Sequence, residues 1–198
     1  MSQPRPSVLD RLARLFAAAL ACTAFLAAGP AAAAGEDLSR PVFLVASAKL
    51  ADTPFQDAVL IAVPFGQGEH VGFILNKPTD TRLSALFPEH APSRQVKSPV
   101  YIGGPVMPQV LFAVVREADK PEQGVMPLMP GLVFVSGEAA VDSVIEKTPN
   151  RARYFAGLMG WRAGELEQQV EEAFWTVRDA DANALFGDEG GSPAPRPR

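Results

Sequence analysis

Short apolar, β-branched runs recur along the chain after residue 35, and glycine or proline separates most of them. Runs of this kind, bounded by turn-forming residues, are typical of buried β-strands. The pattern predicts strands at residues 42–46, 58–63, 71–75, 110–115, 132–135 and 174–177. A further strand-like run at 154–156 leads into a segment with two glycines and a tryptophan, after which a charged helix begins.

Helical spacing is found between these strands. A helical turn at 83–87 stops at Pro88, and the polar stretch 89–98 is predicted to be a loop. Ser136 is the expected N-cap of a helix that runs to Lys147, where Thr148 and Pro149 end it. Two more helices are expected at about 163–173 and 179–186. The fold class predicted is mixed α/β: a single domain with a mixed, largely antiparallel sheet flanked by helices.

The first 34 residues have the pattern of a secretory signal peptide. Arg5, Arg11 and Arg14 give a basic start, and an apolar run rich in Ala and Leu follows at 15–28. Gly29-Pro30 then breaks the helix, and small residues lead up to Gly35. We therefore expect cleavage after Ala34, a domain at 35–187, and a periplasmic or secreted location. The Gly- and Pro-rich tail at 188–198 is expected to be disordered.

Other interpretations of the leader exist. A membrane anchor would need about 20 strongly apolar residues, whereas this run is short, rich in alanine and interrupted by Gly29-Pro30. A wrongly assigned start codon is a third interpretation. Lipidation of Cys22 is not favoured, because a lipoprotein site has a Leu-like residue three positions before the cysteine, where this chain has Ala19. Cleavage would leave a chain without thiols, so disulfides and cysteine metal sites are excluded, and we expect no stable membrane anchor.

Charge adds a constraint on partners. Three of the 18 basic residues and one of the 22 acidic residues, Asp10, lie in the leader, which leaves 15 basic and 21 acidic residues and a net charge of −6. The remaining chain has no basic cluster. Binding to nucleic acid usually requires a basic patch, so we expect no nucleic-acid partner.

Three glycine-containing motifs follow one another along the domain. The first, Gly-Glu-His-Val-Gly-Phe-Ile-Leu-Asn-Lys-Pro at 68–78, is a glycine-flanked strand that ends in Leu-Asn-basic-Pro. The second, Val-Tyr-Ile-Gly-Gly-Pro-Val at 100–106, is a turn that leads into a strand. The third spans 155–167, and Trp175 follows its helix. In order and spacing the three motifs resemble the AlgH/YqgE family of bacterial proteins, over about residues 38–186.

The resemblance implies a single α/β domain without a settled activity. Some members of the family are labelled transcriptional regulators, and most are cytoplasmic, so the signal peptide is a departure. The motifs depart in detail as well. Val115-Arg116 replaces the common Leu-His, Leu158-Met159 replaces Tyr-Ala, and Arg162-Ala163 replaces Gly-Pro. A function that the family places on these polar positions would be changed here.

Five residues of the motifs are candidates for ligand binding: Asn76, Gly103, Gly104, Trp161 and Glu165. Consecutive N–H groups at Gly103-Gly104 could form an anion-binding nest, but a tight turn with close backbone packing is favoured, because Pro105 lacks a donor. Asn76 either caps a turn, which we favour, or reaches into a pocket. Trp161 is favoured as a core or interface residue. Glu165 and Glu167 complement the positive end of the following helix and so oppose an anionic ligand there.

No catalytic constellation is evident. His70 and His90 lack ligand spacing with a second histidine or a carboxylate, so we expect neither a metal nor another cofactor. No serine lies in a Gly-x-Ser-x-Gly elbow. The acidic residues Glu165, Glu167, Glu171 and Glu172 share one predicted helix, as solvated helix faces often do.

Three hypotheses on function remain. The favoured one is an exported, non-enzymatic binding or interaction module, whose partner is an unknown small ligand or envelope protein. A pocket between the loops of Asn76, Gly103 and Trp161 would support it. A cytoplasmic transcriptional regulator is the second, and it rests on family labels alone. The third is an unrecognised hydrolase or small-molecule enzyme that uses His70 or Glu165 together with Asn76.

Overall fold

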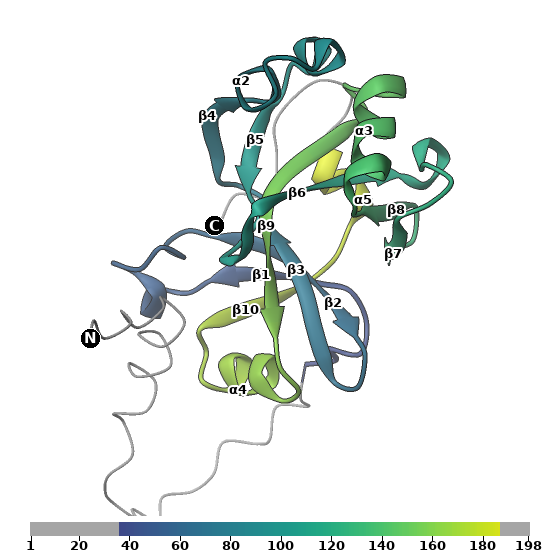
Figure 1. Ribbon diagram of the computed structural model, residues 1–198. Helices are drawn as coiled ribbons and strands as arrows, with labels where there is room; N and C mark the ends of the chain where they lie inside the picture. Colours follow the sequence, from purple (N-terminus) through teal and green to yellow (C-terminus); the bar gives the residue numbers. More distant parts are fainter. Residues whose placement is uncertain (1–35, 187–198) are drawn as a thin grey trace, which may run out of the picture. The chain divides into compact units, whose positions relative to one another are not determined.

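The long strand β9 (Ala152–Trp161) joins the two halves of the sheet in a computed structural model that describes residues 36–186 (Figure 1). Its first part pairs with β6 (Val106–Arg116) on one edge and with β5 (Pro99–Ile102) on the other. Its last residues pair instead with β3 (Glu69–Ile74). The predicted signal peptide and C-terminal tail lie outside the described residues.

The strand order is β10-β1-β2-β3-β9-β6-β8-β7, and β4 is attached through β5. Every pairing is antiparallel except the one between β5 and β9. The predicted mixed, largely antiparallel sheet is confirmed. The remaining strands are β1 (Val42–Ala46), β2 (Val59–Phe65), β4 (Pro78–Arg82), β7 (Val125–Met129), β8 (Leu132–Val135) and β10 (Trp175–Asp179).

Short helices lie between the strands. The α-helices are α2 (Leu83–Leu86), α3 (Glu138–Lys147), α4 (Glu165–Glu171) and α5 (Ala182–Phe186), and the 3-10 helices are η1 (Ala48–Leu50), η2 (Ala91–Gln95) and η3 (Glu117–Asp119). The buried residues of α3 are Val141, Val144 and Ile145, which recur at the spacing of one helix face. They pack in one cluster with residues of β6, β8 and β9.

The first three strands are buried on both faces. On β3, Phe73 belongs to a cluster with residues of β6, β8 and β9, whereas Ile74 belongs to a second cluster with Trp161 and Trp175. Successive residues of a strand point to opposite faces, so both faces must be apolar. For this reason these strands appear in the sequence as continuous apolar runs.

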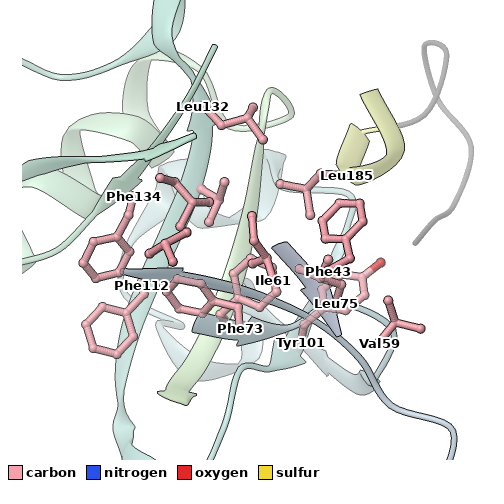
Figure 2. Close-up of a cluster of buried hydrophobic side chains, with 14 residues drawn as sticks. Phe43, Val59, Ile61, Phe73, Leu75, Tyr101, Phe112, Leu132, Phe134 and Leu185 are labelled. Atoms are coloured by element: carbon pink, nitrogen blue, oxygen red, sulfur yellow. The ribbon is translucent and has the colours of Figure 1, made fainter. Parts of the chain in front are cut away.

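Phe73 is at the centre of the first cluster (Figure 2). Its ring centroid lies 4.9 Å from that of Phe155, 5.3 Å from that of Phe134 and 6.2 Å from that of Phe112. Aromatic pairs at such distances and tilted angles add to the free energy gained by burying the rings. One side chain of β3 therefore ties together β6, β8 and β9.

Several predicted boundaries are wrong. The N-cap of α3 is Gly137 at φ 90°, and it makes no side-chain capping bond, so Ser136 is not the cap. Asp179 ends β10, and α5 begins only at Ala182. The predicted loop at 89–98 contains η2. Strands β4, β5 and β7 were not predicted, because β4 is a polar edge strand, β5 is a run of four residues directly before Gly103-Gly104, and Pro127 interrupts the pattern of β7.

Tyr154 provides a test of the packing around α3. Its side chain is fully buried, and its hydroxyl donates to the carbonyl oxygen of Pro149 at 3.2 Å. Burial raises the pKa of this hydroxyl above the usual tyrosine value. Above the unfolded pKa of about 10 the unfolded chain loses a proton that the folded chain keeps, so stability falls as pH rises.

We expect Tyr154→Phe to cost about 1 kcal/mol near pH 8, through the lost hydrogen bond, and to weaken the decline in stability above about pH 10. Urea unfolding of both proteins from pH 8 to 11 measures the difference. The difference in unfolding free energy between the two proteins removes the effect of other groups that titrate in this range. If this difference did not change with pH, the raised pKa of Tyr154 would be contradicted.

Candidate functional site

The three glycine-containing motifs meet in space. The N–H of Ile74 donates to the carbonyl oxygen of Gly103 at 2.9 Å, and the N–H of Gly103 donates to that of Ala156 at 2.8 Å. The N–H of Ile102 also donates to the carbonyl oxygen of Lys77 at 2.9 Å. The end of β3, the end of β5 and the middle of β9 therefore form one backbone junction.

Close approach explains the glycines at this junction. A Cβ on Gly103 would overlap the carbonyl oxygen of Gly157, and one on Gly104 would overlap Leu158. Gly157 itself has φ +71°, and the pairing of β6 with β9 is irregular beside it. The N–H of Gly103 is already used within the sheet. These contacts support the interpretation of Gly103-Gly104 as close backbone packing.

Asn76 acts as a cap. Its Oδ1 accepts from the N–H of Val59 at 2.9 Å, and its Nδ2 donates to the carbonyl oxygen of Asp57 at 2.7 Å. Asp57 has φ 55°, a conformation that is costly for a residue with a side chain. Asn76 thus stabilises the turn before β2, in agreement with the favoured interpretation.

Trp161 lies in the second core cluster and is only 4% exposed. Its Nε1 donates to Oε1 of Gln169 at 3.1 Å, and Nε1 of Trp175 donates to the same oxygen at 2.8 Å. The core interpretation is the one that these contacts support. Glu165 is exposed at the start of α4, where its Oε2 accepts from the N–H of Arg162 at 3.0 Å. That bond closes the turn before α4, whose N-cap, Gly164, has no side-chain capping bond.

The five candidate residues fall into two groups. Asn76, Gly103 and Gly104 lie at the junction in the middle of β9. Trp161 and Glu165 lie at the far end of the strand, since Trp161 is about 13 Å beyond Gly157 along an extended chain. Each of the five has a structural role in the contacts described above.

The two histidines lie in different environments. His70 is 3% exposed, and its Nε2 lies 2.9 Å from the carbonyl oxygen of Leu38. His90 lies beside α3, with Nε2 3.9 Å from Oδ1 of Asp142. Within residues 36–186, no group of three His, Cys, Asp or Glu residues is arranged to hold a metal ion.

A groove of about 510 Å³ opens at one end of the first core cluster. One wall consists of Pro41, Val63 and Pro64, which become neighbours because β1 and β2 pair antiparallel with Val42 opposite Ala62. The other wall includes Val125 and Leu128 of β7 and Leu132 of β8. Neither wall was a candidate in the sequence, because β7 was not predicted and the pairing of Pro41 with β2 depends on register.

The rim of the groove carries one pair of opposite charges. Nζ of Lys120 lies 3.2 Å from Oε1 of Glu117. The N–H of Glu117 donates to the carbonyl oxygen of Gly131, in the turn between β7 and β8, at 2.9 Å. The rim is therefore fixed to the hairpin, and its charges largely cancel.

Comparison with known proteins identifies the family. A family model described as AlgH-like matches residues 43–193. The chain belongs to the AlgH-like family. A UPF0301 protein of Chlorobium limicola is 32% identical over 149 residues, which cover 73% of this chain and 77% of the relative. A UPF0301 protein of Magnetococcus marinus is also 32% identical over 149 residues, which cover 73% and 78%.

Two solved structures share the fold. The solution structure of the AlgH protein from Pseudomonas aeruginosa has a TM-score of 0.65 at 23% identity, covering 77% of this chain and 82% of that one. A crystal structure of a Corynebacterium diphtheriae protein has a TM-score of 0.59 at 23% identity, covering 77% and 81%. The names of these AlgH-like relatives specify no reaction or ligand. None of the helices among residues 36–186 is long and apolar enough to cross a membrane.

The junction of this AlgH-like fold can be tested with two glycines on the same strand. Gly157→Ala places a Cβ against backbone oxygens at a positive φ, so we expect a loss of about 3 kcal/mol in unfolding free energy. Gly160→Ala is the matched control, since its Cβ would meet only a side-chain carbon of Val106 at 3.7 Å. We expect the control to stay within about 1 kcal/mol of the parent. Equal losses in urea unfolding would contradict the argument from backbone contact.

Proposed function

We propose that this protein is an exported binding module that holds a small apolar ligand in the groove between the end of β2 and the β7–β8 hairpin. The observation that carries the proposal is the groove itself, with its apolar walls and a volume of about 510 Å³. Pockets that bind small molecules have volumes of about 300–1,000 Å³ and mostly apolar linings.

The chemistry of the groove favours an uncharged or weakly polar group. Val63, Leu128 and Leu132 line it with side chains that are almost fully buried. Val125 is 37% exposed and stands at the opening. The charges of Lys120 and Glu117 satisfy each other, so neither is free to select a strongly charged ligand.

An enzyme built on the proposed residues gains no support. His70 faces the second core cluster, and Asn76 lies about 20 Å further along the extended chain, where its amide caps a turn. Glu165 is exposed on α4. The regulator hypothesis continues to rest on family labels, and the acidic net charge of the domain opposes binding to DNA.

Export is the first part of the proposal, and the basic, apolar and small-residue order of residues 1–34 supports it. We expect a Gram-negative host that expresses the full chain to contain a periplasmic species beginning at Gly35. Cell fractionation followed by intact-mass measurement of the soluble protein tests this. A cytoplasmic species that retains residues before Ala34 would refute export.

Ligand binding is the second part, and N-phenyl-1-naphthylamine, an uncharged apolar fluorophore, is a suitable probe. We expect saturable fluorescence enhancement with the folded protein, and Val125→Glu to weaken it about tenfold, because an apolar wall residue is replaced by a charge. Leu86→Glu is the control, since Leu86 is 47% exposed on α2, away from the groove, and its loss should leave the affinity unchanged.

Two results would refute the groove as the binding site. One is the absence of saturable enhancement in the parent protein. The other is an equal loss in the Val125 and Leu86 variants, which would mean that the dye binds exposed apolar surface in general. Circular dichroism of both variants confirms that the fold is retained before the affinities are compared.

A further inference from the structure

Arg153 is a buried arginine that has no counter-charge among residues 36–186. It is 7% exposed, and among residues 36–186 no carboxylate forms an ion pair with it. Its hydrogen bond within that range runs from Nη1 to the carbonyl oxygen of Leu75, at a long 3.4 Å. Arginine is almost never buried in this way unless it is paired.

Its position on β9 explains the burial. Arg153 lies opposite Val114 of β6, on the same strand face as Phe155, whereas Ala152 and Tyr154 belong to the cluster on the other face. The guanidinium is therefore directed to the end of the first core cluster. Its Cζ lies 5.1 Å from the ring centroid of Tyr101.

The contacts of Arg153 only partly offset the cost of burying its charge. Burial lowers the pKa of its guanidinium, although an arginine remains charged in proteins. The ring of Tyr101 and the carbonyl oxygen of Leu75 supply partial compensation. A guanidinium has five N–H donors, and one of them is used by the part of the chain that the structure describes. The hydroxyl of Tyr101 also makes no hydrogen bond within residues 36–186.

We propose that Arg153 and Tyr101 form a binding site for a carboxylate group. The flat fork of a guanidinium matches the two oxygens of a carboxylate, and such charge-assisted pairs are about twice as strong as neutral hydrogen bonds. The hydroxyl of Tyr101 adds a second type of donor beside it. The site is separate from the apolar groove and does not depend on the function proposed for the groove.

The carboxylate has two possible sources. One is a free carboxylate ligand. The other is the chain itself, because Asp188 and Glu189 follow Phe186 closely in the sequence. Leu185 belongs to the same core cluster as Leu75 and Tyr101 (Figure 2). The ring centroid of Phe186 lies 5.3 Å from Cζ of Arg116. The end of α5 is thus near this part of the core, and the experiment must distinguish the two sources.

The experiment follows the arginine Nε–Hε resonances by NMR in the protein purified after expression of the full chain. Sodium acetate replaces sodium chloride at constant ionic strength. We expect a saturable shift of one resonance, assigned to Arg153 because it is absent from Arg153→Lys. Affinities are compared through the backbone amide resonances of Ala152 and Tyr154, which every variant retains, because the lysine variant lacks the side-chain resonance. The lysine variant should bind acetate about tenfold more weakly, and Tyr101→Phe about fivefold more weakly. Arg178→Lys, at an exposed position on β10, is the control and should bind as the parent does.

A second protein with a stop codon after Phe186 separates the sources. Acetate binding to both proteins supports a free carboxylate ligand. Binding to the truncated protein alone, with a shifted Arg153 resonance before acetate is added, supports the chain's own carboxylates. No saturable acetate effect on Arg153 in either protein overturns the proposal, as does an unchanged affinity in Arg153→Lys once thermal unfolding shows that this variant is folded.

Discussion

The backbone contact between Gly103 and Gly157 determines the point at which β9 changes partner. Before this contact β9 pairs with β5 on one edge, and after it the same edge pairs with β3. Two strands can share one edge only if their ends come close without side chains between them. The glycines permit that approach, and the hydrogen bond from Ile74 to Gly103 joins the two strand ends directly.

The apolar packing depends on this junction. Because β9 continues through it, Phe155 and Trp161 belong to one strand but to different core clusters. The rings around Phe73 fill the space between the first three strands and β6, β8 and β9, whereas the two tryptophans anchor α4 and β10 on the opposite face. The junction thus sets which apolar residues can meet, and burial then stabilises that arrangement.

The elements that the sequence predicted correctly are those whose residues bury both faces of a strand. The strands at Val42–Ala46 and Leu132–Val135 were predicted with their observed bounds, because apolar runs between turn residues leave little choice. Strand β4 was missed, since its polar residues belong to an edge whose pairing with β5 depends on the chain fold. The start of α3 was misplaced because Gly137 takes a positive φ that a pattern of polar and apolar positions does not encode.

The candidate residues show a related limit. Motif resemblance located Asn76, Gly103 and Trp161, and the structure gives each of them a supporting contact within the fold. Arg153 had no signal in the sequence, because the lack of a counter-charge among its described neighbours is visible only in the fold. The groove likewise depends on register, which brings Pro41 beside Val63.

Gln169 of α4 links the strand before this helix to the strand after it. A single side-chain oxygen accepts from the indoles of Trp161 and Trp175, so both of its lone pairs are occupied by donors from strands on either side of α4. Neither strand can leave without breaking one of the two hydrogen bonds that this oxygen accepts. The shared oxygen thus links the end of β9, α4 and the start of β10, so we expect the segment from Trp161 to Trp175 to open as one unit rather than strand by strand.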